Sequence, residues 1–179
     1  MITIFEGPRN SGKTFLANRF ADINGSKIFK FDFVYWFNEL NLPDDSESTH
    51  LFALGKEAML LQLNRDGMLP DFVLDRGFLT VLTWGVLAGR ITEEKAQAQL
   101  KILAEKNLLK NCRIIYIMGS NPNKDSRNKD NWDHIDGTEE EQKIMENLRD
   151  YISNHPYNVE LKIVFNSFDN TVIPQLEKI

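Results

Sequence analysis

The residues that most clearly predict chemistry form one run near the start of the chain, Gly7-Pro8-Arg9-Asn10-Ser11-Gly12-Lys13-Thr14. The run has the P-loop pattern G-x-x-x-x-G-K-T, in which a glycine-rich loop holds a polyphosphate. Gly7 and Gly12 let the backbone turn tightly and approach the anion. Successive backbone N–H groups and the start of the next helix attract it. We expect Lys13 to reach the β- and γ-phosphates of ATP, and the Thr14 hydroxyl to bind Mg²⁺.

The residues on either side of this run supply the context that the pattern requires. Residues 1–5 are apolar and β-branched, which predicts a short buried strand, and residues 15–21 carry apolar side chains at helical spacing. A strand, a glycine loop and a helix in this order favour a nucleotide site over a chance match in a glycine turn. The loop does not identify the acceptor of a transferred group.

Asp75 and Arg76 are the next candidates, at the end of the apolar strand predicted over residues 71–75. A carboxylate at this place can enter the Mg²⁺ shell or accept a proton. A guanidinium suits planar, bidentate recognition of phosphate. The alternative is structural, with the two residues forming an ion pair at the strand end or Asp75 capping the helix that starts near Gly77.

Asp32 follows the second predicted strand, residues 27–31, and precedes a cluster of aromatic side chains. We interpret it as the base that receives the proton of an acceptor hydroxyl, a role worth about 10²–10⁴-fold in rate. The alternative is an N-cap for the helix predicted from Phe33. Among the aromatic residues, Tyr35 and Trp36 are expected to line an acceptor pocket, although such clusters also form cores.

The polar stretch of residues 119–136 lies between two well-defined elements and is predicted to be a lid. A lid can bring cations over a transferred phosphoryl group. Arg127 is the best candidate because arginine stabilises spread charge well. Lys124 and Lys129 are equally consistent with a solvated surface.

The rest of the chain alternates between strand and helix patterns, which predicts an α/β fold with a doubly wound parallel sheet. Strands are expected over residues 1–5, 27–31, 71–75, 113–118 and 159–165. Helices are expected over residues 13–23, 33–40, 46–65, 77–89, 92–110, 138–154 and 169–178. The length suggests a single domain over residues 1–179. Ligands of such sheets sit beyond the carboxyl ends of the strands, so one rim should carry all of the candidates.

Composition limits the setting and the partners. No apolar run is long enough to cross a bilayer, so we expect no membrane partner. The single cysteine, Cys112, cannot form an internal disulfide and fits a reducing, cytoplasmic setting. The net charge of −5 and the pI of about 5.3 argue against broad binding to nucleic acid, which needs a basic surface, but leave room for a local basic groove.

Several of these motifs resemble a known group of enzymes. Residues 5–7 leading into Gly12-Lys13-Thr14 are similar to the opening of thymidylate kinases. Asp75-Arg76 resembles their Asp-Arg pair and the acidic-Arg pair of deoxynucleoside kinases. The acid after the second strand, followed closely by Trp36, also resembles the deoxynucleoside kinases, in which that acid is the base for the sugar hydroxyl.

The resemblance implies a P-loop kinase fold with five parallel strands and a lid. It also implies that the P-loop, Asp75, Arg76 and Arg127 bind phosphates and Mg²⁺, and that Asp32 faces the acceptor. Homodimers are common in this group. The chain departs from thymidylate kinases by having Phe31-Asp32-Phe33 after the second strand and Arg9 and Asn10 within the loop. These departures leave the acceptor open.

We therefore expect an ATP- and Mg²⁺-dependent phosphotransferase that acts on a nucleoside or (deoxy)nucleoside monophosphate. Lys13, Asp32, Arg76 and Arg127 would be catalytic, and Tyr35 and Trp36 would help to bind the substrate. One alternative is a kinase acting on DNA, at a strand end or on a hydroxymethylated base. A second is a P-loop NTPase or switch without a small-molecule acceptor, and a third is a binding module without turnover, which the intact Gly12-Lys13-Thr14 disfavours.

Overall fold

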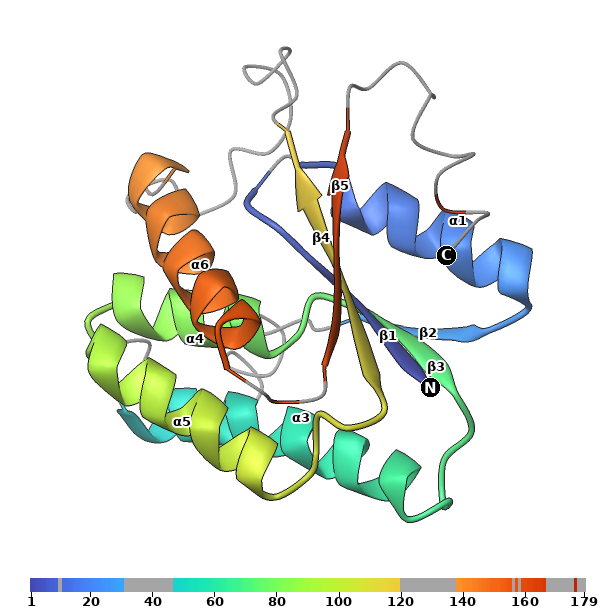
Figure 1. Ribbon diagram of the computed structural model, residues 1–179, viewed down its shortest axis with the longest axis horizontal. Coiled ribbons are helices and arrows are strands. Elements are labelled where there is room, and N and C mark those ends of the chain that lie inside the picture. Colours follow the sequence, from blue (N-terminus) through green and yellow to red (C-terminus); the bar gives the residue numbers. More distant parts are fainter. Residues whose placement is uncertain are drawn as a thin grey trace.

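A five-stranded parallel sheet forms the centre of the computed structural model (Figure 1). The structure describes residues 1–9, 11–30, 47–119, 138–155, 157, 159–166 and 176. The strand order is β2-β3-β1-β4-β5, and every neighbouring pair is parallel. The strands are β1 (Ile2–Glu6), β2 (Lys27–Lys30), β3 (Phe72–Asp75), β4 (Cys112–Met118) and β5 (Glu160–Phe165). The predicted α/β fold with a five-stranded parallel sheet is confirmed.

Helices cover both faces of the sheet, because both faces of its central strands are apolar. In β1, Ile4 contributes to a core on one side and Phe5 to a core on the other. The larger core packs against four helices, and the smaller core packs against α1 and Leu176 (Figure 1). The helices are α1 (Lys13–Asn24), α3 (Glu47–Arg65), α4 (Phe78–Leu87), α5 (Glu93–Glu105) and α6 (Thr138–Ser153).

The parallel register brings the carboxyl ends of the central strands to one rim. Phe5 pairs with Asp75, and Lys30 at the end of β2 pairs with the same residue on its other side. Glu6, the last residue of β1, pairs with Tyr116 of β4. The loop that leaves β1 therefore starts beside the ends of β3 and β4, as the sequence predicts.

One helix is shorter than expected, since α5 ends at Glu105 and not near Lys110. Asn107 has a left-handed backbone with φ 56°, and the amide of Leu108 donates to the carbonyl of Leu103 at 3.0 Å. This is the Schellman arrangement that ends many helices, with asparagine in the left-handed position. The other element boundaries that can be compared differ by at most two residues.

Some expectations fall outside the described residues. They are the helix over residues 33–40, the lid beyond Gly119, and the final helix over residues 169–178 apart from Leu176. Among the residues that the structure describes, no helix has both the length and the apolarity needed to cross a membrane.

The contact between α3 and α4 gives a direct test of the packing. Buried His50 of α3 hydrogen-bonds to Gln99 of α5 at 2.7 Å and lies against Gly85 of α4. A Cβ atom on Gly85 would stand 2.7 Å from His50 Cε1, so the packing leaves no room for a side chain. We expect Gly85→Ala to lower the free energy of unfolding by about 1–3 kcal/mol, as overpacked cores do, in urea denaturation.

Gly55→Ala is the matched control, because Gly55 also lies within a helix but no described atom is within 4 Å of its Cβ position. There we expect a gain of about 0.5–1 kcal/mol from the higher helix propensity of alanine. Equal effects of the two substitutions would contradict the close packing of α3 on α4.

Candidate active site

The loop between β1 and α1 has the backbone conformation that only its glycines allow. Gly7 and Gly12 have φ angles of 144° and 83°. A Cβ on Gly7 would also collide with the carbonyl oxygen of Ile117. From the end of β5, the buried Asn166 side chain donates a hydrogen bond from Nδ2 to the Ser11 carbonyl at 2.9 Å. The loop is thus held by β4 and β5 as well as by its own turn.

The features of this loop fit an anionic ligand. Gly12 is the N-cap of α1 and has no side chain that could cap the first turn, so the helix start is open to an anion. Ser11 Oγ is buried and has no hydrogen-bond partner among the described residues. A polyphosphate would supply acceptor oxygens for the backbone amides at the start of α1 and for the Ser11 hydroxyl.

Lys13 is the buried cation of the loop. Only 4% of it is exposed, and its Nζ donates to the Pro8 carbonyl at 2.9 Å. Burial, and to a smaller extent repulsion by Arg76, lowers the pKa of Lys13 from 10.5 to about 8. The amine therefore lies within the loop, where a phosphate would bind. A bound anion there would favour the protonated, positively charged form of Lys13.

Thr14 and Asp75 already meet, with Thr14 Oγ1 donating to Asp75 Oδ1 at 3.1 Å. A hydroxyl and a carboxylate are the hard oxygen ligands that Mg²⁺ prefers, and Mg²⁺ usually completes its shell with water and substrate phosphates. Within the described part of the chain, no group of three or more His, Cys, Asp or Glu residues could hold a metal alone. The residues present fit a Mg²⁺ that arrives with a nucleotide.

Arg76 occupies a strained turn directly after β3. Its φ angle is 75°, a left-handed value that costs a non-glycine residue about 1–3 kcal/mol. The Arg76 amide donates to the carbonyl of Phe5 at 3.0 Å, which ties the turn to the strand before the P-loop. The charge of Arg76 reaches Lys13, whose pKa it lowers.

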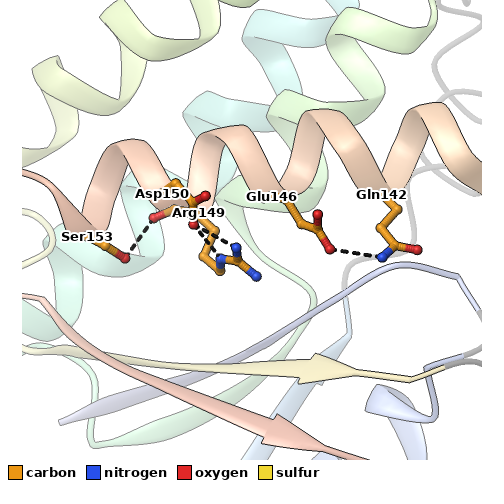
Figure 2. Close-up of polar contacts among 5 residues, drawn as sticks. All are labelled: Gln142, Glu146, Arg149, Asp150 and Ser153. Atoms are coloured by element: carbon orange, nitrogen blue, oxygen red, sulfur yellow. Dashed lines mark hydrogen bonds and ion pairs between the residues drawn. The ribbon is translucent and has the colours of Figure 1, made fainter.

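The start of α6 brings a further acid to the loop. Figure 2 shows polar contacts along α6, among them Gln142 Nε2 donating to Glu146 Oε1 at 2.9 Å. The Arg149 guanidinium lies 5.0 Å from the centre of the Tyr116 ring, which ties α6 to β4. This packing places the buried Glu141 beside the P-loop.

Glu141 holds Arg9, a residue inside the P-loop pattern. The Arg9 amide donates to Glu141 Oε1 at 3.2 Å, and Arg9 Nε lies 3.7 Å from Glu141 Oε2. The Arg9 guanidinium also covers the ring of Trp84 at 4.2 Å. Burial raises the pKa of Glu141, and the charges of Lys13 and Arg9 oppose that rise.

Sequence reasoning missed Glu141, because an acid in the first turn of a helix is ordinary. Of the predicted site residues, the structure brings together Asp75, Arg76 and all of the P-loop except Asn10, which is not described. Four further predicted residues lie outside the described residues: Asp32, Tyr35, Trp36 and Arg127.

Comparison with known proteins places the fold. No family model and no curated protein sequence matches the chain. Solved structures of deoxyadenosine kinase from M. mycoides are similar to it over 99% of this chain, with a TM-score of 0.61 in each comparison. The structure with the products dCMP and dCDP is 16% identical in sequence, and the match covers 96% of that chain. The structures with dATP and dCTP are 16% and 15% identical, and each match covers 97% of that chain. The expected P-loop kinase fold is thus confirmed.

The lowered pKa of Lys13 predicts that nucleotide binding takes up protons. At pH 8 the free amine is about half protonated, and a bound polyphosphate favours the charged form, so Mg·ATP binding should take up about half a proton. Calorimetry in buffers of different ionisation enthalpy measures this uptake. Lys13→Arg, which keeps a charge that does not titrate, should abolish it. Unchanged uptake in that variant would contradict the assignment to Lys13.

Proposed function

We propose that this protein is a Mg·ATP-dependent phosphotransferase whose acceptor is a nucleoside or (deoxy)nucleoside monophosphate. The observation that carries the proposal is the meeting of Thr14 with Asp75 beside the buried amine of Lys13. A hydroxyl, a carboxylate and a cation gathered at the start of a helix are the parts that hold the phosphates of ATP and their metal ion.

The donor half of the reaction rests on described residues. The β- and γ-phosphates lie in the P-loop, and Lys13 exchanges the Pro8 carbonyl for phosphate oxygens. Thr14 and Asp75 would hold the Mg²⁺, which would supply positive charge to the transferred phosphoryl group. Arg76, one residue beyond Asp75, adds a guanidinium that stabilises charge on the transferred group.

The acceptor half rests on the sequence predictions. Asp32 accepts the proton of the attacking hydroxyl, whose oxygen bonds to the γ-phosphorus while the bond to the leaving ADP oxygen breaks. An acceptor phosphate is already anionic and needs no such base, so Asp32 would then hydrogen-bond the sugar. Tyr35 and Trp36 line the acceptor pocket, and Arg127 adds charge from the lid.

The similar structures support an acceptor of nucleoside type. The M. mycoides enzyme is called a deoxyadenosine kinase and was solved with deoxynucleotides, and this chain shares its fold over nearly the whole length. The acidic net charge disfavours a DNA acceptor. P-loop NTPases also hold Mg²⁺ with a P-loop serine or threonine and an aspartate, so the transfer of label to an acceptor must be measured.

A transfer assay with ATP labelled at the γ-phosphate tests the proposal. The panel contains nucleosides, nucleoside monophosphates, and DNA with ordinary or hydroxymethylated bases. We expect label on a monomer, and we expect Lys13→Ala to slow transfer by about 10²-fold or more, because it removes charge stabilisation at the reacting group. Lys101→Ala is the control, since Lys101 is an exposed residue of α5 that pairs with Glu105.

Label on DNA alone would show that the acceptor is DNA and not a small molecule. Free phosphate without a labelled acceptor would favour an NTPase. Normal transfer by the Lys13→Ala variant would contradict the P-loop assignment.

A further inference from the structure

Two buried carboxyl groups lie behind the candidate site, and the proposed chemistry does not use them. Glu6 is the last residue of β1 and Glu57 belongs to α3, and both are fully buried. Each lies within the larger core side of the sheet, where an unpaired charge is costly. The burial of two carboxyl groups side by side therefore requires a structural or functional explanation.

Both carboxyl groups face the first turn of α4. A Cβ atom on Gly77 would stand 2.7 Å from Glu57 Oε1 and 3.1 Å from Glu6 Oε1, so the two oxygens adjoin the same point. Glu6 Oε1 accepts hydrogen bonds from the amides of Leu79 at 2.9 Å and Thr80 at 3.4 Å. Glu6 Oε2 accepts one from Thr80 Oγ1 at 2.5 Å.

Glu57 lacks such donors. The Phe78 amide faces it and opposes the rise in its pKa, but neither Glu57 oxygen has a partner with hydrogen-bond geometry among the described residues. Burial raises the pKa of Glu6 to about 7. Burial, and then repulsion by Glu6, raises the pKa of Glu57 well above 4.5. The donors around Glu6 favour the charge there, so the proton belongs on Glu57.

Among the residues that the structure describes, three other titratable groups face this pair. Lys13 of α1 is the cation, and its charge lowers the pKa of Glu6. Cys112 and Tyr116 of β4 are the others, and burial raises the pKa of both, to about 12 for Cys112. Both therefore stay neutral near pH 7. The charged groups at this place are then the carboxyl pair and Lys13.

The position of Arg76 connects this pair to the site. Arg76 has a left-handed backbone that persists only where the surroundings impose it. On one side its amide is held by the Phe5 carbonyl, and on the other the chain enters Gly77 and the turn that Glu6 caps. Because Glu6 also precedes Gly7, one residue links the P-loop to the Arg76 turn.

We propose that Glu6 and Glu57 are positioning residues for Arg76, a carboxyl pair that holds one proton and fixes the first turn of α4. The charge of Glu6 anchors the amides of that turn, and protonated Glu57 fills the space beside it without a second charge. The proposal rests on the proposed function, in which Arg76 acts on the transferred phosphoryl group.

Two isosteric substitutions separate the roles of the two acids. Glu57→Gln imitates a protonated acid, and we expect it to keep the wild-type kcat. Glu6→Gln removes the negative charge that anchors the first turn of α4, and we expect kcat to fall by about 10²-fold, the effect of a small misplacement, with the KM for ATP little changed. Equal losses in the two variants would overturn the assignment of the proton to Glu57.

A double-mutant cycle with Arg76→Ala distinguishes positioning from general stability. If Glu6 acts through Arg76, Glu6→Gln should cost little further kcat in the Arg76→Ala enzyme. If it merely stabilises the fold, the two losses will multiply, and the proposal fails. Thr80→Val, which removes one donor to Glu6, repeats the cycle should Glu6→Gln not fold.

The same assays separate this proposal from the proposed function. A wild-type protein that transfers no phosphate to any acceptor overturns both. An active wild-type enzyme with multiplying losses overturns the positioning role alone.

Discussion

The parallel pairing of β1 with β3 is the constraint on which the site depends. Because Phe5 pairs with Asp75, the P-loop leaves the sheet beside the two residues that follow the same register. The Thr14–Asp75 contact and the hydrogen bond from the Arg76 amide to Phe5 are both consequences of this pairing. A slip of one residue would turn Asp75 to the opposite face and dismantle the site.

The same rim concentrates charge in the interior of the protein. Lys13, Glu6, Glu57 and Glu141 are all buried, and burial is the largest influence on the pKa of each. Buried charges are tolerated where hydrogen bonds and opposite charges compensate them. Here Lys13 compensates Glu6, and Lys13 and Arg9 compensate Glu141, whereas neither Glu57 oxygen has a hydrogen-bond partner among the described residues.

The sequence predicted those parts of the site that local patterns determine. The P-loop depends on consecutive residues, and Asp75 and Arg76 mark a strand end, so both could be placed on the rim in advance. Glu57 and Glu141 could not, because each looks like an ordinary polar residue of a helix and gains its meaning from distant partners. The contact between Arg9 and the Trp84 ring joins residues far apart in the sequence, and the local pattern around neither residue indicates it. The end of α5 depended on one left-handed asparagine that periodicity does not reveal.

The most direct test of the central claim is a crystal structure of the protein with Mg²⁺ and a non-hydrolysable ATP analogue. The account predicts that the β- and γ-phosphates lie in the loop of residues 7–14. Lys13 Nζ should leave the Pro8 carbonyl for phosphate oxygens, and Thr14 and Asp75 should bind the metal ion directly or through water. An analogue bound away from the P-loop, with the Lys13–Pro8 hydrogen bond intact, would contradict the account.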